Sequence, residues 1–149
     1  MMLLDASAII AILARQSDGV SLMARLAAAG GKIYVSPLTV VEAVLGLARV
    51  KSSAGSVVTA ERISLAEAAV AEFVTAVGAK DMVITMEVAR LALKLGRERG
   101  KIVGHGVGWN LGDCLAQACA QSYRLQLLAT RNGAGDLLTE HEETVRDGD

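Results

Sequence analysis

Short apolar runs alternate along this chain with longer stretches of helical period, and this alternation constrains the fold more than any other feature. Four runs have the length and side chains of buried strands, and two helical stretches separate each run from the next. Parallel strands need a crossover connection, so the pattern predicts an α/β domain with a central, mostly parallel sheet. The predicted strands are Met1–Leu4, Ile33–Val35, Met82–Thr85 and Leu125–Thr130.

Local signals predict where helices begin and which faces they bury. Ser36 followed by Pro37 is a capping residue with a proline at the first helical position, so a helix is expected over residues 37–50. Further helices are expected over about 7–14, 18–29, 60–77, 86–99 and 110–123, with a glycine-rich loop over 100–109. The buried side of the helix over 60–77 is predicted to carry Ile63, Ala66, Val70, Phe73 and Val74.

The composition is that of one compact domain over residues 1–149, with an acidic tail after Glu140 that we expect to be frayed. Hydrophobic residues make up 52% of the chain and charged residues 21%, which excludes a disordered chain. The formal net charge of −1 provides no overall basic field, so a nucleic-acid substrate would need local basic residues or metal ions. Only four aromatic residues are present, which argues against a face that stacks nucleobases.

The sequence favours a cytoplasmic protein without a membrane span. The apolar start lacks a basic region and is interrupted by Asp5, unlike a signal peptide. Cys114 and Cys119 lie five residues apart on one predicted helix and point to different sides, so we expect two reduced core residues.

Three strongly apolar stretches each carry a single carboxylate: Asp5 in MMLLDASAIIAIL, Glu42 in LTVVEAVLGLA and Asp113 in LGDCLAQACA. An ionised carboxylate is costly in apolar surroundings unless it is paired, hydrogen-bonded or bound to a metal. Asp5 directly follows the first predicted strand, at the sheet edge where α/β proteins bind ligands. These acids are therefore the best candidates for functional residues.

Each acid also has a structural explanation. Asp5 could cap the helix that follows, with Ser7 nearby. Asn110 and Asp113 have the spacing of a capping box, and an acid suits the first turn of a helix. Glu42 lies in mid-helix with no cation three or four residues away, so it would need an exposed face or a distant partner.

Taken together, three acids on three elements favour a shared oxygen-lined site for Mg²⁺ or Mn²⁺. Metal ions held in this way activate water and stabilise charge at phosphorus. The only histidines, His105 and His141, form no pattern with a nucleophile, and the loop around His105 does not have dinucleotide-binding spacing.

The segments LLDASAIIAIL, SPLTVVEAVLGL, WNLGDCLAQACA and LLATRNGAGDL, in this order and over nearly the whole chain, resemble the PIN-domain ribonucleases, and most closely their VapC-type toxin branch. The resemblance implies a three-layer α/β/α sandwich. It also implies a metal-dependent endoribonuclease in which water attacks RNA phosphodiesters and leaves 5′-phosphate and 3′-hydroxyl ends. Carried over by motif, Asp5 and Asp113 are metal ligands, Glu42 is the acid after the second strand, and Ser7 is the small hydroxyl residue beside the first acid.

The fourth acidic position departs from the family pattern. Thr130, Arg131 and Asn132 follow the last strand where the family often has an acid. Asp136 lies slightly further on and is the candidate for the fourth acid and third metal ligand, although a turn residue in a glycine-rich stretch fits equally well.

Basic and polar residues near the acids are candidates for binding the substrate. Arg131 and Asn132 follow the last strand, and Arg97 and Arg99 precede the glycine-rich loop. A charged run of this kind is also commonly a solvated helix face.

The resemblance further implies an RNA substrate, a small VapB-type antitoxin, and a homodimer. The low positive charge favours recognition of a defined RNA shape, as in tRNA or another structured RNA. Two alternatives stay open at this point. One is a catalytically inactive interaction module, because no clear fourth acid is present. The other is a small-molecule phosphohydrolase with Asp5 as the nucleophile, which Ser7 disfavours because that pattern requires an aspartate at its position.

Overall fold

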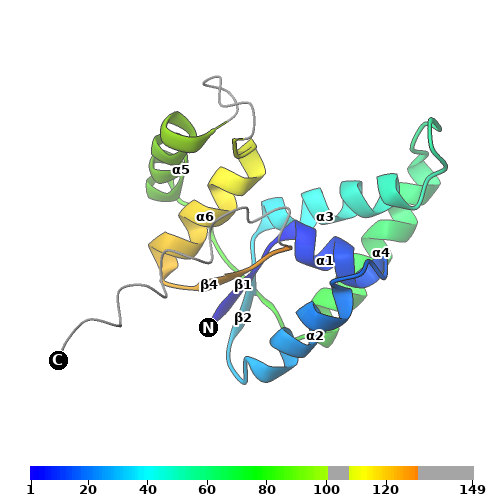
Figure 1. Ribbon diagram of the computed structural model, residues 1–149, viewed down its shortest axis with the longest axis horizontal. Coiled ribbons are helices and arrows are strands. Elements are labelled where there is room, and N and C mark those ends of the chain that lie inside the picture. The colour runs from blue at the N-terminus through cyan, green and yellow to red at the C-terminus, as the bar shows by residue number, and fades with distance from the viewer. Residues whose placement is uncertain (101–107, 131–149) are drawn as a thin grey trace.

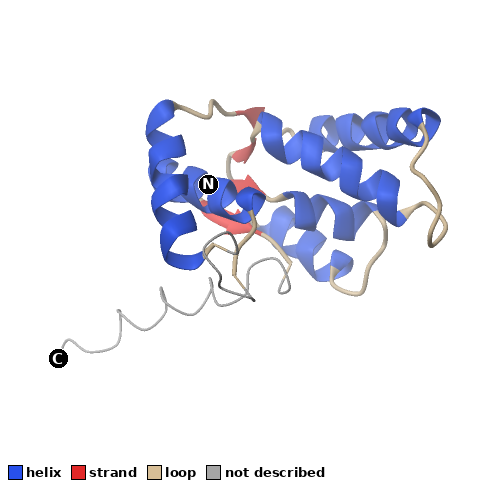
Figure 2. Ribbon diagram, turned by 90° about the horizontal axis from the view of Figure 1, so that it is seen from above, coloured by secondary structure: helices blue, strands red, loops and turns tan. Residues whose placement is uncertain are grey.

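A computed structural model of the chain describes residues 1–100 and 108–130. These residues form a parallel sheet flanked by helices (Figures 1 and 2). In chain order the elements are β1 (Met2–Leu4), α1 (Ala6–Leu13), α2 (Gly19–Ala28), β2 (Ile33–Val35), α3 (Pro37–Val50), α4 (Ala60–Ala76), β3 (Lys80–Asp81), α5 (Met86–Arg99), α6 (Leu111–Tyr123) and β4 (Gln126–Leu128).

The sheet has four strands in the order β3-β2-β1-β4, and every neighbouring pair is parallel. β1 lies in the interior, where Leu3 is opposite Tyr34 of β2 on one side and Leu127 of β4 on the other. The prediction of an α/β domain with a parallel sheet is therefore confirmed.

Helices cover both faces of the sheet, which makes three layers. α1 to α4 lie on one side and α5 and α6 on the other (Figure 1). Side chains alternate along β1, so that Met2 and Leu4 join the core beneath α1 to α4 whereas Leu3 joins the core beneath α5 and α6. The predicted three-layer α/β/α sandwich is confirmed, because each face of the interior strand is buried under its own helical layer.

The capping signals in the sequence define the helix starts. The Oγ atom of Ser36 accepts a hydrogen bond of 3.1 Å from the backbone N–H of Thr39, and Pro37 occupies the first turn of α3, as predicted. On α4, Ala66, Val70 and Phe73 are buried, while Ile63 and Val74 pack against the same core. The predicted buried face of this helix is therefore confirmed.

The third strand was predicted in the wrong place. It covers Lys80–Asp81 and not Met82–Thr85. Its partner β2 ends at Val35, because Ser36 starts α3, so the last ladder bond runs from the Met82 N–H to the Val35 carbonyl at 3.0 Å. The apolar side chain of Met82 is buried in the core under α5 and α6, and Met82 does not belong to a strand.

Cys114 and Cys119 are both free and buried on α6, as predicted. Burial raises the pKa of both thiols, which keeps them protonated. No helix within residues 1–100 and 108–130 is both long and apolar enough to cross a membrane.

Replacing Ile9 by alanine tests the core beneath α1 to α4. Ile9 is fully buried, so Ile9→Ala should lower the free energy of unfolding by about 2–5 kcal/mol through lost burial and a residual cavity. Leu65→Ala on α4 is the control, because Leu65 is 66% exposed and its loss should change stability by no more than about 0.5 kcal/mol. Urea unfolding measures both variants, and equal effects would contradict this description of the core.

Candidate active site

The side of the sheet to which successive strands are added reverses between β1 and β4. The chain passes from β1 to β2 and β3 on one side and then returns to place β4 on the other. In open parallel sheets such a switch point leaves a crevice beyond the strand ends, where ligands bind. Asp5 follows β1 at this point, and its N–H donates to the Leu128 carbonyl of β4 at 3.0 Å.

Asp5 caps α1 and is connected to the end of β4 through Ser7. Its Oδ2 atom accepts hydrogen bonds from the Ser7 N–H, at 2.9 Å, and from the Ser7 hydroxyl. The same hydroxyl accepts a bond of 3.2 Å from the Thr130 N–H. The structural explanation of Asp5 as a helix cap is correct, and Ser7 joins the two strand ends that flank the switch point.

Asp113 closes a capping box at the start of α6. Its Oδ2 atom accepts from the Asn110 N–H, and the Asn110 side chain accepts from the Asp113 N–H, both at 2.8 Å. This predicted arrangement is confirmed. It does not exclude a second role, because an ionised carboxylate has two oxygens and about four acceptor positions.

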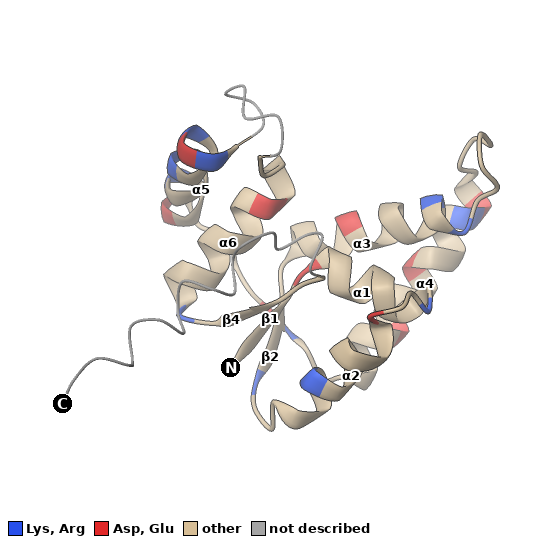
Figure 3. Cartoon of the chain, viewed as in Figure 1, with Lys and Arg blue, Asp and Glu red and all other residues tan. Residues whose placement is uncertain are grey.

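Glu42 is half-buried in the middle of α3, and its carboxylate lies against Gly112 at the start of α6. The pKa of Glu42 is raised above its usual range, firstly because the group is desolvated and secondly because of the negative charges of Asp5 and Asp113. Asp5 and Asp113 thus both act through their charge on Glu42. Figure 3 shows acidic segments on α3, on α6 and directly after β1 around the region between α3 and α6.

The three acids converge, but the described residues do not form a complete set of metal ligands. Within the part of the chain that the structure describes, no three His, Cys, Asp or Glu side chains are close enough to hold an ion. Asp5 and Asp113 each have an oxygen engaged in a helix cap, whereas Glu42 reaches the region from a longer side chain.

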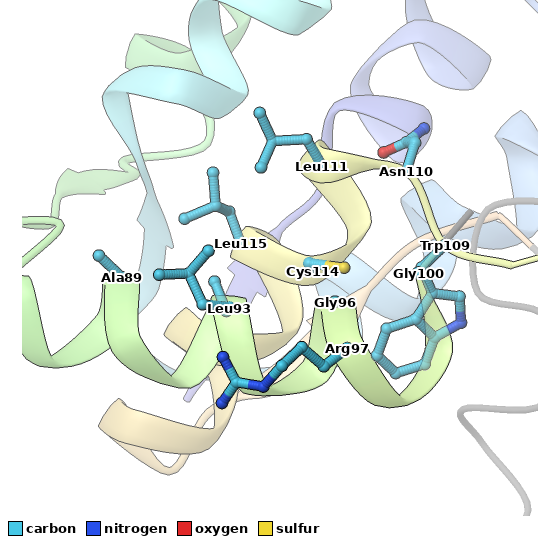
Figure 4. A pocket seen from close by; sticks show the side chains of 11 residues that line it. Ala89, Leu93, Gly96, Arg97, Gly100, Trp109, Asn110, Leu111, Cys114 and Leu115 are labelled. Atoms are coloured by element: carbon cyan, nitrogen blue, oxygen red, sulfur yellow. The ribbon is translucent and has the colours of Figure 1, made fainter. Parts of the chain in front are cut away.

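Arg97 and Arg99 lie in the last turn of α5. Arg99 stacks over the indole ring of Trp109, with its guanidinium carbon 5.3 Å from the ring centroid. Arg97 lines an apolar pocket of about 400 Å³ between α5 and α6. Figure 4 shows Leu93 and Leu115 lying toward one another in this pocket, with Asn110 at the start of α6. Because Asn110 also belongs to the Asp113 capping box, the pocket adjoins the acidic region.

Three predicted site residues lie outside the described residues: Arg131, Asn132 and Asp136. The predicted glycine-rich loop falls largely outside them too, as does the acidic tail.

Sequence reasoning missed two contacts at this site. One is the contact between Gly112 and Glu42, which joins residues seventy positions apart and has no local signal beyond a glycine next to Asp113. The other is the stacking of Arg99 on Trp109, which follows from a backbone bridge between Gly100 and Trp109.

Residues 2–134 match the PIN domain family, so the chain belongs to that family. A relative from Rhizobium meliloti (strain 1021), named a VapC ribonuclease, is 35% identical over 134 residues. The match covers 89% of this chain and 94% of that relative. The resemblance to VapC-type PIN domains inferred from the sequence motifs is confirmed by these matches.

The raised pKa of Glu42 predicts how the stability of the metal-free protein depends on pH. The folded state binds the Glu42 proton more tightly than the unfolded state, in which the pKa has the ordinary glutamate value. This contribution is fully present below the unfolded pKa and is lost as the pH rises through the higher folded pKa. Glu42→Gln should therefore be more stable than the native protein at neutral pH, with the difference shrinking in acid.

Urea unfolding in chelator-treated buffer, at neutral pH and below the usual glutamate pKa, measures this difference. Glu72→Gln is the matched control, because Glu72 is exposed near the end of α4. This end of α4 leads to the start of β3, at the sheet edge opposite the three acids. A Glu42→Gln variant that is less stable than the native protein at neutral pH would contradict the electrostatic description of the site.

Proposed function

We propose that this chain is a metal-dependent endoribonuclease of the VapC type, which hydrolyses RNA phosphodiester bonds. The observation that carries the proposal is the convergence of Asp5, Glu42 and Asp113, from three separate elements, at the switch point of the sheet. Membership of the PIN domain family and likeness to a protein named a VapC ribonuclease support the same activity.

The three acids fit a hard divalent cation in donor type and in charge. Carboxylate oxygens are the ligands that Mg²⁺ and Mn²⁺ prefer, and a cation between them would offset the repulsion that, after burial, raises the pKa of Glu42. In the proposed site Asp5 and Asp113 hold the ion together with Asp136, and Glu42 completes the acidic set. When bound, the ion would supply an activated water and stabilise the charge that develops at phosphorus.

The remaining residues are proposed to hold the acids and the substrate. Ser7 keeps the Asp5 carboxylate at the end of β1, because it hydrogen-bonds Asp5 and Thr130 together. Arg97 and Arg99 are exposed on α5 and would contact RNA phosphates, as would Arg131 and Asn132. Cleavage would leave 5′-phosphate and 3′-hydroxyl ends.

The proposed partners follow from the same family relationship. They are an RNA, a VapB-type antitoxin that neutralises the toxin, and a second copy of this chain in a homodimer. The low positive charge of the chain favours a structured RNA such as tRNA. The proposed compartment is the cytoplasm.

A catalytically inactive PIN-fold interaction module is the second candidate. It is favoured because residues 1–100 and 108–130 contain no group of three His, Cys, Asp or Glu side chains close enough to hold a metal ion. Metal binding and RNA cleavage distinguish the two functions.

Replacing Asp113 by asparagine tests catalysis without removing the helix cap. An asparagine oxygen can still accept from the Asn110 N–H, so α6 should keep its start. With Mg²⁺ or Mn²⁺ the native chain, stripped of any partner, should cut a tRNA pool. Asp113→Asn should lower the rate by about a hundredfold or more, because losing a ligand removes at least as much as losing one of its supporting groups.

Chelator should abolish cutting by the native chain, and Glu72→Gln should cut at the native rate because Glu72 lies toward the opposite sheet edge. Cutting by Asp113→Asn at the native rate would exclude the proposed site. Absence of cutting across a broad panel of RNAs, together with absence of metal binding, would favour the inactive module.

Metal binding should also appear as a gain in stability. An ion that binds only the folded state stabilises it by about 2.7 kcal/mol at a hundredfold excess over its dissociation constant. Mn²⁺ or Mg²⁺ should therefore raise the melting temperature of the native chain, and Asp113→Asn should lose most of this rise. A rise of equal size in both proteins would show that the ion binds elsewhere.

A further inference from the structure

Gly112 is buried at the start of α6, and the space where its side chain would be is filled by the carboxylate of Glu42. A Cβ atom built on Gly112 would lie 2.8 Å from both the Cδ and the Oε2 atoms of Glu42, and closer still to Oε1. The three nearest heavy atoms to that Cβ position, leaving aside the backbone of its own helix, all belong to this one carboxyl group.

We propose that Gly112 is a positioning residue, whose missing side chain determines where the Glu42 carboxylate lies relative to Asp5 and Asp113. The inference rests on the proposed function for its catalytic meaning. The geometric part of the inference is that a methyl group at position 112 displaces this carboxylate. This part does not depend on the proposed function.

The backbone provides no other reason for glycine at this position. Gly112 lies within α6 and is not among the residues with positive φ. Alanine is favoured over glycine inside a helix by about 1 kcal/mol. Alanine would therefore suit the local helix better than glycine, and the three nearest atoms that obstruct its side chain all belong to Glu42.

Substitution should move Glu42 and leave the protein folded. The three nearest atoms form the far end of a flexible side chain on α3. The capping box next to Gly112 is built by Asn110 and Asp113 and does not involve the added methyl group. Gly112→Ala should consequently keep the fold while it shifts one of the three acids.

The experiment combines Gly112→Ala with Glu42→Asp. The aspartate side chain is one methylene shorter, so its carboxylate should lie farther from position 112. Gly96→Ala is the matched control, because it also adds a methyl group to a helical glycine. That methyl would meet only Cys114, with its sulfur at an ordinary 3.9 Å. Each variant is examined by thermal unfolding, by the carbon-13 resonance of the residue 42 carboxyl group without metal, by Mn²⁺ calorimetry, and by RNA cleavage.

In Gly112→Ala we expect a near-native melting temperature and a shifted Glu42 carboxyl resonance. Mn²⁺ affinity and kcat should fall about ten- to a hundredfold, the range typical when a group that orients a metal site is lost, with little change in KM. Gly96→Ala should match the native protein in the carboxyl resonance, Mn²⁺ affinity and RNA cleavage, and its melting temperature should be equal to or slightly above the native value because alanine is favoured inside a helix. In the Glu42→Asp background Gly112→Ala should add less than about a twofold loss, because the two changes act on one contact and are not additive.

Two results would overturn the proposal. One is an unmoved Glu42 resonance in the metal-free Gly112→Ala variant. The other is an equal loss of Mn²⁺ affinity in the Glu42 and Glu42→Asp backgrounds, which would indicate that the methyl group acts through general damage to α6. A shifted resonance in a protein that neither binds Mn²⁺ nor cuts RNA would support the role of Gly112 in placing Glu42, and would contradict the nuclease function alone.

Discussion

Asp5 and Asp113 can both act on Glu42 because β1 lies in the interior of a parallel sheet. β1 pairs with β2 on one side and with β4 on the other, so that the ends of three strands meet at one edge. Asp5 stands at the end of the interior strand, and the helices that follow β2 and precede β4 bring Glu42 and Asp113 toward it.

The site is held together by helix caps as well as by the sheet. Asp5 caps α1, and Asp113 is one half of the capping box of α6, so both carboxylates are fixed by the local backbone. Glu42 has no such cap and reaches the same region from the middle of α3, where Gly112 leaves room for its carboxylate. Two acids are thus positioned by short-range hydrogen bonds and one by packing between helices. The acid positioned by packing is the one whose pKa is raised, firstly by burial and secondly by the charges of the other two acids.

Residues whose role is local could be predicted from the sequence. The proline after Ser36, the spacing of Asn110 and Asp113, and the placement of Asp5 after an apolar run each predicted a cap that the structure contains. The third strand could not be placed correctly, because its length depends on where β2 ends and not on its own side chains. Met82 has the character of a strand residue, yet it is buried beneath α5 and α6.

The sequence by itself determined the class of fold and the three candidate acids. Alternating apolar runs and helical stretches define the layers, and a charged group in an apolar segment stands out without any structure. Only the tertiary structure decided that the Glu42 carboxylate lies against Gly112 and that Ser7 joins Asp5 to the end of β4. Both contacts cross long separations along the chain, and they depend on how closely α3 and α6 approach and on the register of β1 with β4. Local side-chain patterns carry no record of such distances, because these are set when the helices pack on the sheet.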